Sequence, residues 1–301
     1  MSHYIHKCII IVFASAIFLL MFTNRVFALG NSTWKIYYPH YNLISTLDEV
    51  MPDKKFTITF SHDINYSELS KSSIEIYNSS MGNKINFTYK ALSLNKIEIS
   101  PEQPLDYGQV YYIIVHNDIK NKYNISMKTG AVCEIKIISN EHLSFLNSIK
   151  DGAEETFKQY NIFPSVTMAQ AILESGWGQS DKAAKCNNVF GIKAGVNWTG
   201  PTMELPTKEY VNGKYIDTTA LWRVYSNIGD SIMDHGVFLQ KSNYVNSGVL
   251  TASNYVEQSN ALYKGGYATD PLYAQKICST INRLDLWKYD PQGTKIAYTA
   301  K

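Results

Sequence analysis

The segment Ala169-Gln170-Ala171-Ile172-Leu173-Glu174-Ser175-Gly176-Trp177-Gly178 joins an apolar run to a polar, glycine-rich end. The run begins near Pro164, and proline fits the first turn of a helix because its missing N–H is not needed there. Gly176 and Gly178 do not continue a helix comfortably. We therefore predict a short buried helix that starts near Pro164 and ends beside Glu174.

Glu174 is the carboxylate that this apolar run delivers to the end of the helix. Burial disfavours the charged form of a carboxyl group and raises its pKa, which allows the group to donate a proton near neutral pH. Glu174 is therefore a candidate general acid. The alternative is structural, because a carboxylate here can also cap a turn or pair with a basic residue.

Four further blocks follow this segment in order: Asn187-Asn188-Val189-Phe190-Gly191-Ile192-Lys193, Arg223-Val224-Tyr225-Ser226, Ser231-Ile232-Met233-Asp234-His235 and Gly266-Tyr267-Ala268-Thr269-Asp270-Pro271-Leu272-Tyr273-Ala274. With the Glu174 segment they closely resemble the bacterial endo-β-N-acetylglucosaminidase family, which cuts the glycan strands of peptidoglycan. The resemblance extends from about Glu141 to Trp287. It implies a lysozyme-like α+β fold, with a mainly helical lobe, a small β-hairpin flap and a cleft between them.

The resemblance also implies roles for single residues. Tyr267 is expected in the active site beside Glu174. The expected substrate-binding residues are Trp177, Asn188, Phe190, Gly191, Tyr225 and Tyr273. Structural alternatives stay open for these residues: the aromatic rings can be core, and asparagine amides can hold the carbonyls of a turn where glycine lets backbone approach closely.

A hairpin is predicted around Asn212-Gly213, a strong turn signal. Glu209 lies just before this turn, in a Thr-Lys-Glu context that resembles the family's Thr-x-Glu, and it is the first choice for a second carboxylate. Glu204 lies an odd number of residues away and would face the other side of the strand, so it is the fallback. Asp230 and Asp234 are weaker candidates, and an exposed hairpin glutamate without a role is the structural alternative.

Two side chains after the hairpin have more than one interpretation. Arg223 and Tyr225 share a face of the return strand and either line the groove or pack the flap onto the helices. His235 falls on an apolar helical stripe, and we expect a core histidine with satisfied hydrogen bonds. It is not expected to bind a metal, because no second His or Cys lies at metal-binding spacing.

The implied reaction is hydrolysis of the β-1,4 bond between N-acetylglucosamine and N-acetylmuramic acid, with Glu174 protonating the leaving oxygen. Inversion through a water requires Glu209 about 6.5 to 9.5 Å from Glu174, and direct attack requires about 5 to 5.5 Å. A third route uses the 2-acetamido group of the sugar, oriented by Tyr267. No metal or other cofactor is required, since two carboxylates and a tyrosine suffice.

The first residues are typical of a signal peptide. A short basic region ends at Lys7, residues 8–22 are apolar, and Val26-Phe27-Ala28 is a small-x-small cleavage pattern. We expect cleavage after Ala28, so that residues 1–28 are removed. An uncleaved anchor is the alternative, but it needs about 20 apolar residues and this run is shorter.

Length, charge and cysteine content restrict the remaining possibilities. About 270 residues stay after the leader, which suggests two domains. The 28 basic and 26 acidic residues give no single-sign field, so a nucleic-acid partner is not expected. Cys133, Cys186 and Cys278 are expected as buried small hydrophobes, with a bridge between Cys186 and Cys278 as a minor alternative.

Residues 34–138 alternate apolar and polar side chains in six or seven short runs separated by turn residues, which predicts an antiparallel β-sandwich. Two phrases, at residues 51–61 and 97–111, resemble the bacterial Ig-like modules of surface-layer and cell-wall proteins. Asp63, Asp106 and Asp118 are interpreted as turn formers. The expected role of this domain is to space or anchor the enzyme in the wall.

At Ser139-Asn140 the period changes from two to between three and four, and we place the domain boundary there. Residues 139–290 form the predicted catalytic domain and residues 291–301 a C-terminal tail. We expect a secreted monomer, outside the cell or in its wall, without stable membrane insertion. Competing functions are a lytic transglycosylase, a catalytically inactive wall-binding protein and an adhesin.

Overall fold

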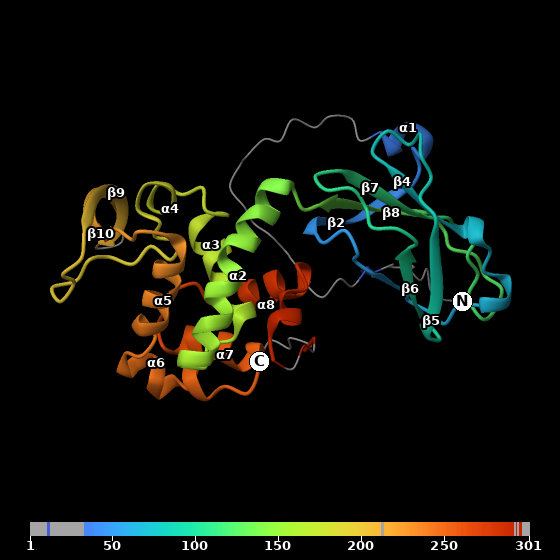
Figure 1. The fold of residues 1–301 in the computed structure, drawn as a ribbon. Coiled ribbons are helices and arrows are strands. Elements are labelled where there is room, and N and C mark those ends of the chain that lie inside the picture. Colours follow the sequence, from blue (N-terminus) through green and yellow to red (C-terminus); the bar gives the residue numbers. More distant parts are fainter. Residues whose placement is uncertain (1–10, 13–32, 212–213, 292, 294, 297–301) are drawn as a thin grey trace. The chain divides into compact units, whose positions relative to one another are not determined.

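The computed structural model describes residues 11–12, 33–211, 214–291, 293 and 295–296, without the side chains of residues 11–12 and 208–215. The chain divides into two compact units that meet between Asn140 and Glu141, and each unit is described by itself (Figure 1). The Asn212-Gly213 turn lies outside the described residues, and so does the predicted signal peptide except Ile11 and Val12. No helix among the described residues combines the length and apolar character needed to cross a membrane.

The first unit consists of two sheets of short strands. One sheet has the order β1-β3-β6-β5 and the other the order β2-β8-β7-β4. Their bounds are β1 (Ile11–Val12), β2 (Asn42–Val50), β3 (Phe56–Thr59), β4 (Ile74–Asn78), β5 (Phe87–Ser93), β6 (Lys96–Pro101), β7 (Val110–Val115) and β8 (Ala131–Ile137). Helix α1 (Trp34–Tyr37) and the 3-10 turns η1 (Tyr66–Glu68) and η2 (Lys71–Ser73) complete this unit.

The period-two pattern produces the expected sandwich. Phe56 and Ile58 of β3 are fully buried while the threonines between and after them are half-buried, as expected for a sheet with one face on the core. The expectation of a wholly antiparallel sandwich is wrong in one place, because β2 pairs with β8 in parallel. In chain order, β2 and β8 are the first and last strands of the second sheet. The chain between them, with its other strands, supplies the long connection that parallel pairing requires.

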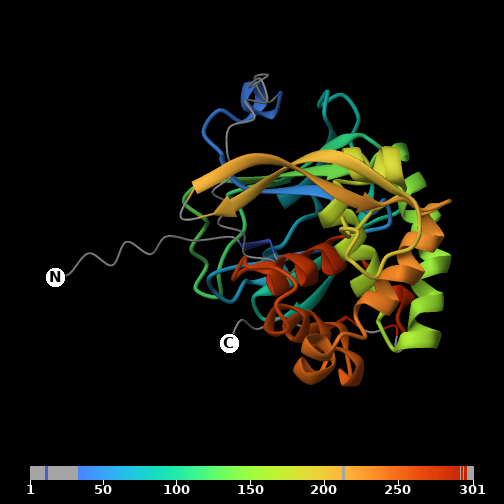
Figure 2. The ribbon, with the colours of Figure 1, turned by 90° about the vertical axis from the view of Figure 1, so that its left-hand side faces the viewer.

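The second unit is mainly helical. Its helices are α2 (Asn140–Tyr160), α3 (Pro164–Ser175), α4 (Asp181–Cys186), α5 (Ile228–Phe238), α6 (Ser242–Ser247), α7 (Tyr255–Lys264) and α8 (Tyr273–Arg283), with 3-10 turns η3 (Val249–Thr251) and η4 (Leu286–Tyr289). Strands β9 (Thr202–Val211) and β10 (Lys214–Arg223) pair antiparallel over their full length, and Figure 2 shows them side by side as a long ribbon.

Helix α3 lies in the core of this unit. Every residue of α3 is buried except Leu173 and Glu174, and the helix packs against α7, α8 and η4. Thr156 of α2 contacts Thr167 of α3 through their hydroxyl groups, 3.3 Å apart. The apolar run therefore forms the predicted helix, and its two unburied residues are at its C-terminal end.

Helix ends follow local capping chemistry. The Ser180 hydroxyl accepts a hydrogen bond from the Ala183 N–H and caps α4. Helix α7 starts at Tyr255, because Asn254 accepts from two backbone N–H groups of its first turn. Helix α8 starts at Tyr273, after a separate turn in which the Asp270 carboxylate accepts from the Leu272 N–H.

Two further expectations from the sequence concern the cysteines and the C-terminal residues. Cys133, Cys186 and Cys278 are free and buried, so the bridge considered as a minor alternative is wrong. Part of the predicted tail packs on the helical unit, because the Tyr255 hydroxyl bonds both the N–H and the C=O of Ile296.

Candidate active site

The chain reverses sharply directly after Glu174. Gly176, Trp177 and Gly178 all have left-handed backbone conformations, with φ of 55°, 62° and 76°. This conformation is strained for tryptophan. The Trp177 ring is held by stacking on His142, with centroids 4.1 Å apart and planes at 2°. The reversal ends α3 within two residues of Glu174 and leaves this side chain half-buried in the last turn of the helix.

Glu174 is half-buried and accepts a hydrogen bond from the Tyr273 hydroxyl, 2.7 Å from its Oε1. Burial raises the pKa of Glu174, while the Tyr273 hydrogen bond and the positive charge of Lys182 act in the opposite direction. No described Lys or Arg forms an ion pair with Glu174 within 4.0 Å. The carboxyl group is therefore favoured in its protonated form relative to an exposed glutamate.

Tyr273 and Tyr267 lie against each other beside Glu174. Their rings are stacked, with centroids 5.6 Å apart and planes at 17°. Burial raises the pKa of both hydroxyl groups well above the ordinary value, and the charge of Glu174 adds to this effect. Both hydroxyls therefore remain protonated and can donate hydrogen bonds. Tyr273, which was expected among the substrate-binding residues, is the tyrosine that bonds Glu174.

The Tyr267 ring packs against a buried pair of stacked rings, His235 and Phe190. The edge of Tyr267 meets His235 at 5.7 Å between centroids, and His235 stacks on Phe190 at 3.8 Å with planes at 6°. Phe190 is 5% exposed and His235 is 0% exposed. Burial lowers the pKa of His235 to about 3. The expected core position is confirmed, but neither ring nitrogen has a hydrogen-bond partner among the described residues, so the expected satisfied state is wrong.

The Asn187-Asn188 block anchors the hairpin to the helices. The Asn188 amide donates to the Ile192 and Arg223 carbonyls, and its oxygen accepts from the Ile192 N–H. Asn187 donates to the Tyr225 carbonyl. Gly191 has φ of 61°, and a Cβ there would meet the Lys182 side chain at 3.5 Å. The predicted substrate-binding amide of Asn188 is thus occupied within the protein, while glycine at position 191 is favoured by its left-handed φ and not by lack of space.

Arg223 and Tyr225 pack the hairpin onto α5. Arg223 Nη1 bonds both carboxylate oxygens of Asp234, at 2.9 and 2.7 Å, and the Tyr225 hydroxyl donates to Asp234 Oδ2 at 2.6 Å. The Arg223 guanidinium also lies 4.5 Å over the Trp198 ring. Of the two interpretations of this pair, the described contacts support packing, and they occupy the Asp234 carboxylate.

The two hairpin glutamates have different surroundings. Glu209 pairs with Ile216 in the strand ladder, and its side chain is outside the described part of the chain. Glu204 is exposed, and its carboxylate accepts a short hydrogen bond from Thr219. By the twofold alternation of a strand, position 209 shares a face with Met203 and Leu205, which pack on Cys186 of α4.

Two residues of the site were not predicted. Gln170 is fully buried and donates from Nε2 to the Tyr273 hydroxyl at 3.0 Å. Lys182 lies with its ammonium 4.2 Å over the Trp222 ring, and burial lowers its pKa. A signal for Gln170 was available, because it is a polar residue in an apolar helix, four residues or about one turn before Glu174. Lys182 had none, since its partners come from distant segments.

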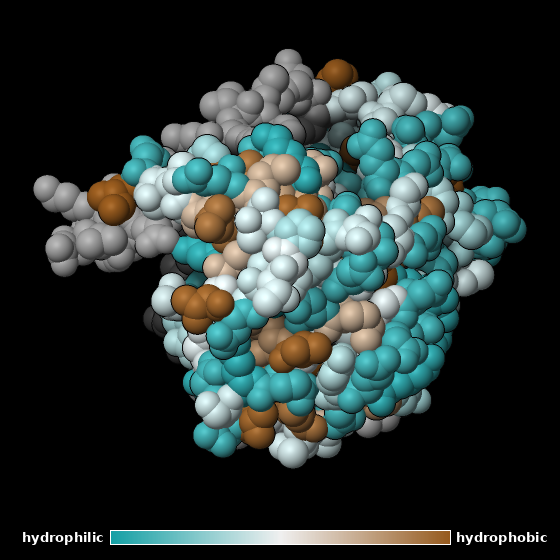
Figure 3. Space-filling model, turned by 60° about the vertical axis from the view of Figure 1, so that its left-hand side comes forward, coloured by the Kyte–Doolittle hydropathy of each residue, from teal (hydrophilic) through white to brown (hydrophobic). Residues whose placement is uncertain are grey.

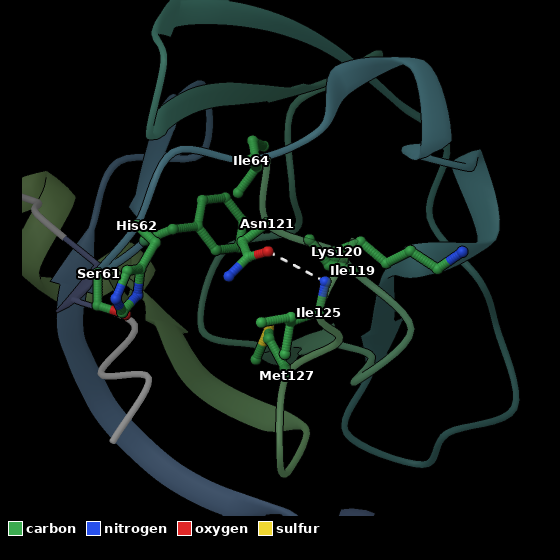
Figure 4. Close-up of a pocket in the computed structure, with 9 residues that line it drawn as sticks. Ser61, His62, Ile64, Ile119, Lys120, Asn121, Ile125 and Met127 are labelled. Atoms are coloured by element: carbon green, nitrogen blue, oxygen red, sulfur yellow. Dashed lines mark hydrogen bonds between the residues drawn. The ribbon is translucent and has the colours of Figure 1, made fainter. Parts of the chain in front are cut away.

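A separate hollow lies in the first unit, where Ile64, Ile119, Ile125 and Met127 meet the polar His62, Lys120 and Asn121 (Figure 4). Asn121 uses its side-chain oxygen to hold the Ile125 N–H at 3.0 Å. No carboxylate lines this hollow, so it lacks an acid for the predicted chemistry. Across the described residues, no three His, Cys, Asp or Glu side chains are grouped to hold a metal ion.

Comparison with known proteins bears on both units. Residues 150–286 match the glucosaminidase family, described as mannosyl-glycoprotein endo-beta-N-acetylglucosaminidase, and residues 45–133 match a bacterial Ig-like domain. The exo-glucosaminidase LytG of Bacillus subtilis is 41% identical over 157 residues, which are 50% of this chain and 54% of LytG. The peptidoglycan hydrolase FlgJ of Salmonella typhimurium is 36% identical over 151 residues, 49% of this chain and 48% of FlgJ.

The chain thus spans about half the length of these two relatives. The crystal structure of the catalytic domain of the autolysin Auto from Listeria monocytogenes aligns with a TM-score of 0.46 at 34% identity, covering 50% of this chain and 88% of that one. Both resemblances seen in the sequence are confirmed. The match over residues 150–286, which includes Glu174 and Tyr267, places this chain in the glucosaminidase family of glycoside hydrolases, behind a bacterial Ig-like domain.

Proposed function

We propose that the protein is a secreted endo-β-N-acetylglucosaminidase that hydrolyses the β-1,4 bond between N-acetylglucosamine and N-acetylmuramic acid in peptidoglycan. The observation that carries this proposal is Glu174, a half-buried carboxyl group with a raised pKa in the last turn of α3, held by the Tyr273 hydroxyl. Family membership supports the reaction class. On the face drawn in Figure 3, hydrophobic residues lie in small groups among hydrophilic ones.

Glu174 acts first in this mechanism. Its proton passes to the glycosidic oxygen, the bond from that oxygen to the anomeric carbon breaks, and the electron pair stays on the leaving oxygen. The resulting carboxylate accepts the Tyr273 hydrogen bond and faces the positive charge of Lys182. Both contacts favour the charged product state of the acid, so they promote proton transfer.

Glu209 is the proposed second carboxylate. Its strand position supports it over Glu204, because position 209 lies on the hairpin face that packs toward α4, and α4 carries Lys182 of the site. Glu204 is exposed and bonded to Thr219. We expect Glu209→Gln to lower kcat at least about 100-fold, the lower range for loss of a general base. Glu204→Gln is the matched control, and equal activities of the two variants would refute the assignment.

The stereochemistry of the product separates the possible routes. Attack by a water activated by Glu209 inverts the anomeric configuration, whereas direct attack by Glu209 and attack by the 2-acetamido group of the sugar both retain it. In the acetamido route Tyr267 orients that group. NMR of the first products formed from a glycan oligomer reads the configuration directly, and retention together with an active Glu209→Gln variant would exclude the water route.

The deciding experiment is digestion of purified peptidoglycan, with identification of the new reducing ends by reduction and mass spectrometry. N-acetylglucosamine ends support the proposal. N-acetylmuramic acid ends would assign muramidase specificity, and 1,6-anhydro ends a lytic transglycosylase. Glu174→Gln should abolish lysis while the protein still sediments with the wall, and a variant that lyses at the normal rate would exclude Glu174 as the acid.

The size of the products and the N-terminus of the exported protein test two further parts of the proposal. Endo cleavage shortens glycan strands internally, whereas the exo mode in the name of LytG releases small units from one end from the start of the reaction. Export with cleavage after Ala28 predicts a mature protein that begins at Leu29. In this protein the Ig-like domain would space or anchor the enzyme in the wall.

A further inference from the structure

Three side chains form a hydrogen-bonded line that ends at the proposed acid. Gln170 and Glu174 lie one turn apart on α3, and Tyr273 is the first residue of α8. Gln170 Nε2 donates to the Tyr273 hydroxyl at 3.0 Å, and this hydroxyl donates to Glu174 Oε1 at 2.7 Å. Gln170 is 0% exposed and Tyr273 is 6% exposed, so water does not compete for these groups.

The direction of this line follows from what each group can do. In the observed orientation of the Gln170 amide, its nitrogen faces Tyr273 and its oxygen has no hydrogen-bond partner among the described residues, so the Tyr273 oxygen accepts from Gln170. The tyrosine has one proton, and with its oxygen facing Gln170 this proton is directed to Glu174 Oε1. Oε1 is therefore an acceptor. In the protonated acid, the proton must be carried by the other oxygen, Oε2.

We propose that Gln170 is a positioning residue that, through Tyr273, keeps the transferable proton on Oε2 of Glu174, the oxygen that Tyr273 does not bond. This inference rests on the proposed function of Glu174. When the proton leaves Oε2 for the glycosidic oxygen, no hydrogen bond within the protein has to break. The Tyr273 hydroxyl already points at the carboxylate that forms.

Without the Gln170 donor the line can reverse. The Tyr273 hydroxyl is then free to turn and accept a proton from Oε1 of Glu174, because a hydroxyl group both donates and accepts. In that arrangement the acid proton lies against Tyr273 and is withheld from the substrate. The enzyme would bind its substrate as before but would react more slowly, so kcat and not KM should change.

A substitution at Gln170 removes no bond of any described titratable group near Glu174 other than Tyr273. Lys182 of α4 and Tyr267, in the loop before α8, are the remaining titratable groups that act on Glu174 or feel its charge. Lys193 acts on Lys182 in turn. None of them bonds Gln170. A change in the pH profile of a Gln170 variant therefore reports the line through Tyr273.

The test compares Gln170→Met, which keeps length but removes the donor, with Gln170→Glu, which replaces the donor by an acceptor. Peptidoglycan digestion is measured from pH 4 to 9 in the full-length protein. We expect kcat of the methionine variant to fall about tenfold, part of the about 10²- to 10⁴-fold that a general acid supplies. KM should stay within about twofold of the wild-type value, because the substitution affects proton transfer and not substrate binding.

The pH profile gives a readout that a structural role would not move. The Tyr273 hydrogen bond lowers the pKa of Glu174. Weakening it in Gln170→Met should move the alkaline limb of the kcat profile to higher pH. Gln170→Glu should lower kcat further and move the limb further, because its carboxylate both draws the Tyr273 proton away and repels the charge on Glu174.

A double variant and a control substitution at a second buried glutamine complete the experiment. In a Tyr273→Phe background, Gln170→Met should change kcat less than about twofold, because its effect passes through the missing hydroxyl. Gln258 is the control: it is equally buried but bonds the backbone of Phe163, Asn161 and Val249. Gln258→Met should lower the unfolding temperature without moving the alkaline limb.

Two results would overturn the inference: an unchanged kcat and limb in both Gln170 variants, or effects of Gln170→Met and Tyr273→Phe that multiply in the double variant. Failure of the proposed function looks different. There, wild-type protein would not digest peptidoglycan, or Glu174→Gln would remain active, and these measurements belong to the same series.

Discussion

His235 makes the stability of the catalytic unit depend on pH, and His235→Phe tests this. The side chain is 0% exposed, stacks on Phe190, and has no hydrogen-bond partner for either ring nitrogen among the described residues. Phenylalanine has a similar flat ring and no polar atoms. Replacing an unpartnered buried polar group by an apolar one of similar shape is neutral or stabilising.

The magnitude follows from the pKa of the imidazole. Burial lowers it from the ordinary 6.5 to about 3. Below pH 6.5 the unfolded chain binds a proton at this histidine that the folded protein does not bind, so stability falls as the pH falls. The loss is about 0.2 kcal/mol at pH 7 and about 2 kcal/mol at pH 5. His235→Phe should remove it, and should therefore gain about 2 kcal/mol relative to wild type between these pH values.

Urea unfolding followed by tryptophan fluorescence measures the effect. Trp34 is the only tryptophan of the first unit, and the other four lie in the second, so the signal mainly reports the catalytic unit. His40 is exposed, and His40→Phe is the control that should leave the pH dependence unchanged. The reasoning is refuted if wild type and His235→Phe lose stability in parallel between pH 7 and pH 5.

Three further predictions concern contacts that hold the site. Burial raises the pKa of Asp290 to about 6, so its contribution to stability is lost as the pH rises through 6, and Asp290→Asn should gain about 2 kcal/mol over wild type between pH 4 and pH 8. A constant difference between the two urea curves would contradict this. Gly178→Ala should cost about 1 to 3 kcal/mol, because φ is 76° and the new Cβ would meet the Phe145 ring at 2.7 Å; an unchanged thermal unfolding midpoint would contradict it. Asp234→Asn should lower the free energy of unfolding by about 1 to 3 kcal/mol, since Arg223 loses its charged partner. It should also speed hydrogen exchange in β9 and β10, and unchanged exchange would show that the pair does not hold the hairpin.

The parts of the site that the sequence predicts are those set by neighbouring residues. The end of α3 at Glu174 follows from the glycines that come directly after it, and the start of α4 follows from the Ser180 cap. Period and turn chemistry act over a few residues, so they can be read from the chain. The burial of the three cysteines and of His235 followed from the same local patterns.

The parts that the sequence missed depend on which distant segments meet. Tyr267 and Tyr273 are six residues apart, and nothing local indicates that the second bonds Glu174, 99 residues away in the chain. The parallel pairing of β2 with β8 is of the same kind, because it depends on the path of all the strands between them. The lack of partners for His235 could not be read either, since an apolar stripe indicates burial but not what surrounds the ring nitrogens.

Helix α3 shows why the local sequence predicts the position of a helix but not the hydrogen-bond partners of its polar residues. Its apolar residues need only to be buried, and many partners can do this. Its polar residues need particular partners, because a buried polar group without one is costly. Ser165 at its start bonds the Asp290 carboxylate through both its N–H and its hydroxyl, and Gln170 and Glu174 share Tyr273. All these partners come from residues 273–290. The last segment of the domain therefore bonds both the start of α3, through Asp290, and Glu174 at its end, through Tyr273, so the candidate site is complete only when that segment has packed.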